Sequence, residues 1–334
     1  MKKTKISIVV TLIFVLVFLM TSCGSSEKTE DNAKDEVDTK EIESSDNEEK
    51  DANQEEKEKT EAEESDSNVA VEVVAKQRED KDNTEVLNLS NLSIESDVLF
   101  EKDNIKVSAV ELTEDEYNGL GVNILVQNNS DKDIYISCPT LSVNDYMVGN
   151  LFSASVKAGQ ESSETIFFLN DFMLDSGLPI NKVADIELQF VTIEESNSQI
   201  LFETEPVQIK TSQFSEDAKE KYDGESVMFE KDGFKIAAMN LYEYEDGNCD
   251  NLLLYIENNS QKDVDVYSSA LVVNDYIINP YYATRLPKGK MIIAPIDISE
   301  ASQKAEKVVV GFEFNEYDSF ESFLETGELN LVVK

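Results

Sequence analysis

NNSDKDIYI, at residues 128–136, returns later in the chain as NNSQKDVDV, at residues 258–266. The match continues outward, because VLFEKD at residues 98–103 returns as VMFEKD at 227–232 and VNDY at 143–146 returns unchanged at 273–276. Gly159 matches Gly289, and Glu203-Thr204 matches Glu325-Thr326. Each copy has about 105 to 115 residues, enough for a hydrophobic core of its own. We therefore expect two similar domains, at residues 98–211 and 224–334.

Within each copy the apolar residues alternate with polar ones, which is the period of a β-strand and not of a helix. Clusters of Asn, Asp, Ser and Gly separate these runs at the spacing of turns in a sandwich. The sequence predicts an all-β fold of two tandem immunoglobulin-like β-sandwich domains, with one helical crossover turn at residues 170–177. The alternating positions are Ile105, Val107, Ala109, Ile134, Ile136, Ile186, Leu188 and Phe190, then Phe234, Ile236, Ala238, Val264, Val266, Val308, Val310 and Phe312.

The segment before the first copy has two parts. Residues 24–66 hold 19 acidic and 6 basic side chains, with Val37 and Ile42 as the only large apolar ones. Such a composition cannot offset the chain entropy of folding, so we expect a disordered, extended spacer within a linker at residues 23–97. Apolar alternation returns between Asn68 and Asp97, for example at Val71 and Val73, and fits either an edge strand or an ordered linker.

The N-terminus has the pattern of a bacterial lipoprotein signal. Three lysines among residues 2–5 precede an apolar run from Ile6 to Met20, and small residues lead up to Cys23. The run is shorter than the roughly 20 residues of a transmembrane helix. The sequence therefore predicts a cleaved signal at residues 1–22 and lipid on the Cys23 sulfur, with diacylglycerol and palmitate-type chains holding the protein at the extracytoplasmic face of the cell membrane. A short uncleaved anchor is the alternative.

Composition excludes several kinds of chemistry. The chain has 69 acidic and 29 basic residues and a formal net charge of -40, which disfavours nucleic acid as a partner because binding it requires clustered Lys and Arg. It contains no His, so it lacks the commonest general base and metal ligand. Cys138 and Cys249 stand in no metal-ligand spacing, and two isolated thiols are favoured over a bridge between the copies. We expect no cofactor, no metal and no catalytic residue.

The NNSDKDIYI and VNDY segments, together with the later Gly159 and the LFETEPVQI ending at residues 201–209, resemble the immunoglobulin-like repeats of uncharacterised lipoproteins from Gram-positive, clostridia-like bacteria. The resemblance extends from Val98 to Lys334. It implies an extracytoplasmic β-sandwich, similar to the mycobacterial immunoprotective extracellular protein type, and brings no catalytic residues. The chain has no Trp, so the Cys and Trp set of antibody domains is missing.

The VNDY motifs are the most conspicuous loop feature. Asn and Asp tolerate positive φ, so a tight hairpin is predicted at each motif. Tyr146 and Tyr276 then either pack within the hairpin, which is the favoured interpretation, or project to bind a partner, for which Tyr281 and Tyr282 would strengthen the second copy. The Asn128-Asn129-Ser130 and Asn258-Asn259-Ser260 segments match the glycosylation acceptor pattern but are interpreted as turns.

A calcium site is the weaker hypothesis for the acidic turn of the second copy. Asp246, Asn248, Asp250 and Glu257 have the spacing of oxygen ligands in a calcium loop. Asn251 stands where such a loop needs Gly, and Leu252 to Ile256 reads as a strand where a helix is required. The first copy offers only residues 114–116 in that turn, so an acidic hairpin is favoured.

These observations predict a non-catalytic lipoprotein whose two sandwiches bind or assemble with an extracellular protein or glycan partner. The alternatives are a solute- or calcium-binding lipoprotein, an accessory subunit of an envelope complex, and an enzyme built on carboxylates alone.

Overall fold

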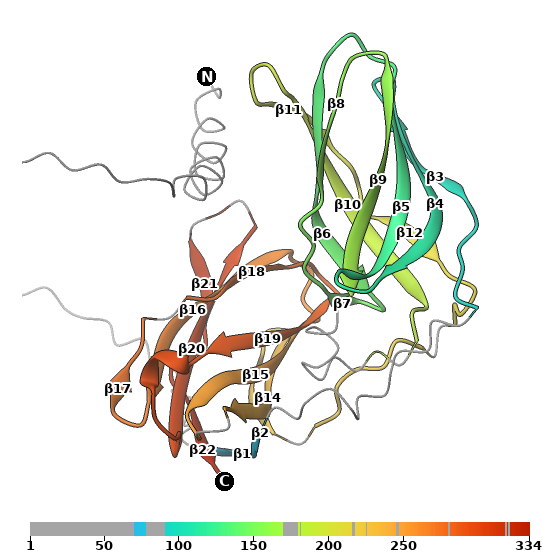
Figure 1. The fold of residues 1–334 in the computed structure, drawn as a ribbon. Helices are drawn as coiled ribbons and strands as arrows, with labels where there is room; N and C mark the ends of the chain where they lie inside the picture. Colours follow the sequence, from blue (N-terminus) through green and yellow to red (C-terminus); the bar gives the residue numbers. More distant parts are fainter. Residues whose placement is uncertain are drawn as a thin grey trace, which may run out of the picture. The chain divides into compact units, whose positions relative to one another are not determined.

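The computed structural model describes residues 70–77, 91–169, 180, 182–215, 218–224, 226–244, 247–279, 281–317, 319 and 321–334, and residues Ser67–Lys334 form one compact unit. The signal at 1–22, the acidic part of the linker and the helical turn at 170–177 lie outside the described residues. The fold is all-β, as predicted, with η2 (Ser299–Ala301) as a short 3-10 turn between strands (Figure 1). Among the described residues no helix is long and apolar enough to span a bilayer.

The first copy folds as two sheets around one core. One is a four-stranded sheet in the order β3-β4-β5-β9, and the other contains β6, β7, β8, β10, β11 and β12. Buried residues of both sheets, including Ile105, Ile136 and Phe190, form one hydrophobic cluster. The strands are β3 (Asp97–Lys102), β4 (Ile105–Asp115), β5 (Gly119–Asn128), β6 (Ile134–Val143), β7 (Tyr146–Met147), β8 (Ser153–Val156), β9 (Gln160–Leu169), β10 (Asp185–Glu194), β11 (Gln199–Glu203) and β12 (Val207–Lys210).

The second copy repeats this order. β13, β14, β15 and β19 correspond to β3, β4, β5 and β9, while the facing sheet carries β16 to β18 and β20 to β22. Phe234, Val266 and Phe312 belong to its core cluster. The strands are β13 (Val227–Lys231), β14 (Phe234–Glu243), β15 (Cys249–Asn258), β16 (Val264–Val273), β17 (Tyr276–Ile277), β18 (Ala283–Leu286), β19 (Met291–Asp297), β20 (Lys307–Glu316), β21 (Ser322–Glu325) and β22 (Leu329–Val333).

The segment before the first copy contributes strands to the second. β1 (Val71–Val73) pairs in parallel with β22, and β2 (Ala75–Gln77) pairs in parallel with β14. Val73 is buried in the second core. Of the two interpretations of this segment, the strand is therefore correct for residues 71–77. The chain thus reaches the second copy first, and only then enters the first one.

One sheet runs through both copies. β7 of the first copy pairs in parallel with β19 of the second through Tyr146 and Met291, which joins strands of both copies in one 11-stranded sheet. The first core cluster accordingly includes Ala237, Leu253 and Tyr255 of the second copy. These side chains alternate with the residues of the second core, so both faces of β14 and β15 are buried at this place.

Candidate functional site

The first VNDY motif forms the tight β6–β7 turn that the sequence predicts. Asn144 and Asp145 have φ angles of 51° and 69°, and Asn274 of the second motif has 53°. Both turns join strands that pair in the same register, Val143 with Tyr146 and Val273 with Tyr276. Positive φ suits Asn and Asp because their short side chains hydrogen-bond locally, which offsets the steric cost.

The asparagine of each motif holds a neighbouring loop. Asn144 Nδ2 donates to the Lys182 carbonyl at 2.6 Å, and Asn144 Oδ1 accepts from the backbone N–H groups of Ala184 and Asp185 at 2.8 and 3.2 Å. Asn274 makes the same three bonds in the second copy, to Lys304, Glu306 and Lys307. The repeated Asn is therefore a structural residue in both copies.

The tyrosine of the first motif lies between the two copies. Tyr146 is fully buried, and its hydroxyl donates to the Glu220 carbonyl at 2.9 Å. Its ring lies 6.4 Å from that of Tyr255, which in turn lies 5.5 Å from Tyr222. Tyr255 belongs to β15, and Tyr222 to the segment that connects the copies. The favoured interpretation of Tyr146 as a packing residue is confirmed, although the packing is against the second copy.

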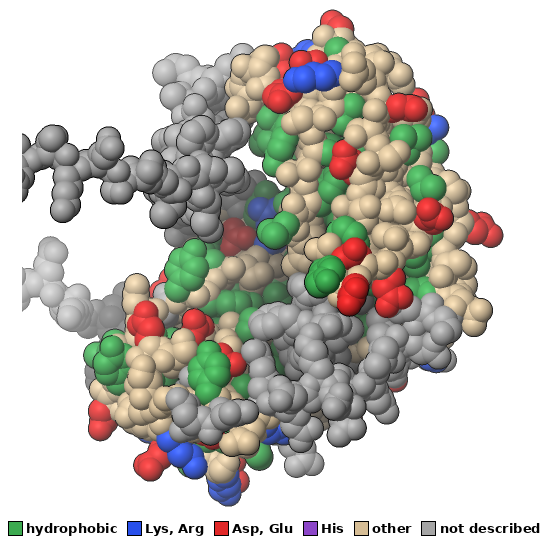
Figure 2. Space-filling model, viewed as in Figure 1, with side chains coloured by type: hydrophobic (Ala, Val, Ile, Leu, Met, Phe, Trp, Pro, Cys, Tyr) green, Lys and Arg blue, Asp and Glu red, His purple; other side chains and the backbone are tan. Residues whose placement is uncertain are grey.

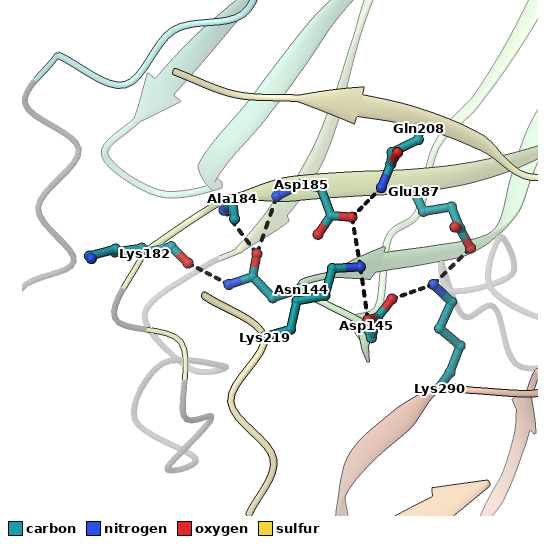
Figure 3. Close-up of polar contacts among 9 residues, drawn as sticks. All are labelled: Asn144, Asp145, Lys182, Ala184, Asp185, Glu187, Gln208, Lys219 and Lys290. Atoms are coloured by element: carbon teal, nitrogen blue, oxygen red, sulfur yellow. Dashed lines mark hydrogen bonds and ion pairs between the residues drawn. The ribbon is translucent and has the colours of Figure 1, made fainter. Parts of the chain in front are cut away.

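A cluster of charges surrounds the first hairpin, and we call it the junction network (Figure 3). Asp145 lies between two lysines, with Lys290 Nζ at 2.8 Å and Lys219 Nζ at 2.9 Å from its oxygens. Lys290 also contacts Glu187 at 2.8 Å, and Lys219 contacts Asp185 at 3.0 Å. Lys290 directly precedes β19, so this network ties the first copy to the second.

The lysines set the protonation of the network. Burial disfavours the charged form of Asp145, but the bonds from Lys290 and Lys219 outweigh this and hold the pKa of Asp145 below its ordinary value. Burial likewise lowers the pKa of Lys219, and its two carboxylate partners overcome that effect and raise it. The charged forms are therefore favoured near neutral pH. A carboxylate held ionised in this way is suited to an ion pair and not to general-acid catalysis.

A shallow groove of about 420 Å³ lies beside the junction network. Its lining includes Asp145, Glu187 and Lys290 together with Arg285, which stacks on Tyr317 with 3.6 Å between the guanidinium carbon and the ring centroid. Arg285 also approaches Asp265 at 3.7 Å. Asp145, Glu187, Lys290 and Arg285 therefore all have ion-pair partners within the protein.

The second VNDY hairpin has a different environment. Tyr276 is 50% exposed and Ile277 is 78% exposed, while Tyr281 nearby is 90% exposed. Tyr282 instead packs edge-on against Phe312, with its ring centroid 6.4 Å away. The same four-residue motif is therefore covered in one copy and open in the other. The binding interpretation of Tyr276 and Tyr281 remains a prediction.

A second exposed apolar surface lies at the loop end of the first copy, and we call it the loop-end patch. It consists of Tyr117, Leu151, Phe152 and Phe167, which line a depression of about 430 Å³. Tyr117 is 85% exposed and Leu151 is fully exposed. Figure 2 shows separate patches of hydrophobic side chains among acidic ones on the face in view. Sequence reasoning missed this patch, because its residues come from three separate loops and strands.

The two NNS segments are turns, as interpreted, and the first asparagine of each is buried. Asn128 Nδ2 donates to the carbonyls of Lys132 and Val156 at 2.7 and 3.0 Å, and Asn128 Oδ1 accepts from Ser130. Asn258 makes the matching bonds to Lys262, Leu286 and Ser260. Both Asn side chains are fully buried, which leaves no room for a glycan. In each copy the buried asparagine therefore joins its own turn to a neighbouring strand by hydrogen bonds.

The calcium hypothesis gains no support. Asp250 and Glu257 both lie on β15, seven residues apart, so the strand separates them by about 23 Å. Glu257 pairs with Lys221. Asp246 lies outside the described residues, and within the described ranges no group of three His, Cys, Asp or Glu side chains could hold a metal ion.

Cys138 and Cys23 have different outcomes. Cys138 is a buried free thiol whose Sγ lies 3.2 Å from the Thr140 carbonyl oxygen, and burial raises its pKa to about 12. A bridge from Cys138 to Cys249 is therefore not formed. Cys23, the predicted lipidation site, lies outside the described residues.

Sequence reasoning also missed the lysines of the junction network. The duplication itself held the signal, because Lys290 corresponds to Gln160 and Tyr255 corresponds to Leu125. Positions where one copy carries a basic or larger side chain and the other a neutral or smaller one indicate a surface that is covered in only one of the two copies.

Comparison with known proteins gives little further information. No family model matches the chain, and no curated protein matches it, so the resemblance to clostridia-like lipoproteins stays a prediction. Similar solved structures include the CsuC–CsuE chaperone–tip adhesion subunit complex of Acinetobacter baumannii (14% identity, 65% of this chain, 94% of that chain, TM-score 0.19). Others are the Amycolatopsis orientalis exo-chitosanase CsxA (10%, 69%, 26%, TM-score 0.19) and a Porphyromonas gingivalis W83 protein of unknown function (12%, 64%, 90%, TM-score 0.17). At these TM-scores the similarities carry no argument about function.

Proposed function

We propose that the protein is a lipid-anchored cell-envelope protein that binds or assembles with an extracellular partner and has no catalytic role. The observation that carries this proposal is the loop-end patch, in which Tyr117 and Leu151 are exposed on a sandwich that has a buried hydrophobic core. Exposed apolar clusters on a rigid scaffold are typical of interaction sites.

Anchoring is supported by the sequence. The basic start, the apolar run and Cys23 form a lipoprotein signal, and the acidic residues 24–66 supply a spacer. Two or more acyl chains would make such an attachment durable. The second copy pairs with β1 and β2, so the tether reaches the second copy before the first. Substituting Cys23→Ser in the full chain should release the protein from the membrane fraction, whereas retention would indicate an uncleaved anchor.

Two partner classes fit the loop-end patch. A protein partner would insert an apolar side chain into the depression beside Phe152 and Phe167, and Leu151 would supply contact area around it. A glycan is the second candidate, favoured by the Tyr117 ring, because an exposed aromatic face can stack on a sugar.

The test uses the full chain isolated with its binding partners from native membranes, together with a glycan array. Tyr117→Ser and Leu151→Asp should each reduce retention of the specific partner at least tenfold. Ile200→Asp is the matched control, since Ile200 is a partly exposed apolar residue of β11, outside the patch residues. Unchanged retention by both patch variants, with the control behaving identically, would contradict the proposal.

A further inference from the structure

The VNDY hairpin occurs twice in two different environments. The first hairpin is covered by the second copy, and we call it occupied; the second is exposed, and we call it open. β7 adds to the sheet beside β19, whereas β17 pairs with β16 and ends the path of the seven-stranded sheet. Asp275, Tyr276 and Ile277 are all exposed. Because the two hairpins share their sequence, their strand register and a positive φ at the asparagine, the environment of the first indicates what the second can bind.

The occupied hairpin is recognised by three features of the second copy. The Met291 N–H donates to the Asp145 carbonyl at 3.0 Å, which is a β-sheet hydrogen bond to the edge strand β19. The ammonium of Lys290 binds the Asp145 carboxylate at 2.8 Å. Apolar side chains on the outward face, Met291 and Ile293 of β19 with Tyr255 of β15, belong to the same cluster as Tyr146. These features are an edge strand, a lysine and an apolar row.

We propose that the open hairpin at residues 273–277 docks onto the edge strand of a β-sheet in a different protein, and that this strand carries a lysine followed by outward-facing apolar residues. The lysine would pair with Asp275, and the apolar row would cover Tyr276 and Ile277. This inference rests on the proposed binding function and names the chemistry of a partner for a second surface, distinct from the loop-end patch.

A second copy of this chain does not have that chemistry. Its acceptor strand in the second repeat is already covered by its own first hairpin. The equivalent edge strand is β9, which ends the four-stranded sheet. There Gln160 and Glu161 stand in place of Lys290 and Met291, and Ser163 stands in place of Ile293. In the same register Gln160 would face Asp275 with no charge to pair with it, and Glu161 would place a carboxylate opposite Tyr276, where Met291 lies opposite Tyr146. Burying that carboxylate without a partner disfavours the contact. The partner is therefore heterologous.

The sequence difference between β9 and β19 makes it possible to build the proposed acceptor strand into this protein. Q160K, E161M and S163I together convert the exposed edge of β9 into the sequence of the β19 acceptor, in the full chain. All three positions are exposed, so the fold should be retained, which far-UV circular dichroism and the urea midpoint check. Sedimentation equilibrium then measures self-association of the wild type, of the triple variant, and of the triple variant with D275N and I277D added.

The expected result is a monomeric wild type, an association constant at least tenfold higher for the triple variant, and return to the wild-type value when D275N and I277D are added. Three results would overturn the inference. A wild type that already associates through the hairpin would make a second copy the occupant. A folded triple variant that stays monomeric would refute the recognition chemistry, and association insensitive to D275N and I277D would reveal a non-specific apolar contact. Loss of the partner in the Leu151→Asp pulldown tests the proposed function separately.

Discussion

Replacing the tyrosine of each VNDY motif by alanine should give two very different results. Tyr146 is fully buried between the copies, and its truncation removes ring contacts to Tyr255 and the hydrogen bond to Glu220. Large aromatic to alanine changes in a core cost about 3–5 kcal/mol. Tyr276 is half exposed, so the same change should cost about 1 kcal/mol or less.

The measurement is urea unfolding of the two variants and the wild type. Far-UV circular dichroism and tyrosine fluorescence serve as probes, because the chain has no Trp. With a slope of about 2–3 kcal/mol per molar urea, Tyr146→Ala should lower the midpoint by about 1.5 M and Tyr276→Ala by less than 0.5 M. Tyr146→Phe isolates the hydroxyl and should cost about 1 kcal/mol.

Equal midpoint shifts for Tyr146→Ala and Tyr276→Ala would refute the reasoning, since both residues would then have similar environments. The comparison of free energies requires coincident curves from both probes. If the two copies unfold in separate transitions, the midpoint of each transition is compared between variant and wild type. The larger midpoint shift should still belong to Tyr146→Ala.

Three further predictions concern other parts of the fold. The pKa of Asp145 is lowered, so its stabilising contribution is present above about pH 4 and is lost as pH falls through the folded-state pKa. The unfolding free energy of Asp145→Asn should therefore fall less steeply than that of the wild type between pH 6 and pH 3. An equal fall in both proteins would contradict this. Asn128→Ala and Asn258→Ala should each lower the unfolding free energy, measured in urea, by about 2–4 kcal/mol, because buried carbonyls lose their donors. Asn129→Ala should change it by no more than about 0.5 kcal/mol. Equal changes for all three variants would show that the two buried asparagines do not stabilise the fold. Cys138 should resist iodoacetamide at pH 8 in the folded protein and react in urea, as followed by peptide mass spectrometry, and rapid labelling without urea would rule out its burial.

Much of the fold could be predicted because its signals are local. Alternation of apolar side chains specifies a strand wherever one face is buried, and it marked β4, β10, β14 and β20 correctly. The Asn of the VNDY motif predicted the turn because few residues adopt positive φ at low cost. The duplication then extended each prediction from one copy to the other.

The junction could not be predicted, because its partners are distant in sequence. Asp145 and Lys290 are 145 positions apart, and identical motifs gave no reason to expect that one hairpin is covered and the other open. The difference depends on what lies opposite each hairpin, which is a property of the tertiary structure. In the same way, alternation at Val71 and Val73 fitted either an edge strand or an ordered linker, and it gave no indication of the pairing with β22.

The architecture explains why the copies diverged at particular positions. Where β19 meets the first hairpin, the second copy has Lys290, Met291 and Tyr255, and the first copy has polar or smaller residues at the same sites. Burial of apolar side chains stabilises the junction, and the ion pairs set its register. Apolar side chains at Tyr276 and at the loop-end patch remain exposed.

The most direct test of the account is the solvent accessibility of the two equivalent tyrosines in the full chain. Hydroxyl-radical footprinting with peptide mass spectrometry reads both positions in one sample. Tyr276 should be oxidised at least several times faster than Tyr146 in the folded protein, and urea should remove the difference. Equal oxidation of Tyr146 and Tyr276 in the folded protein would contradict the occupied and open hairpins on which the account depends.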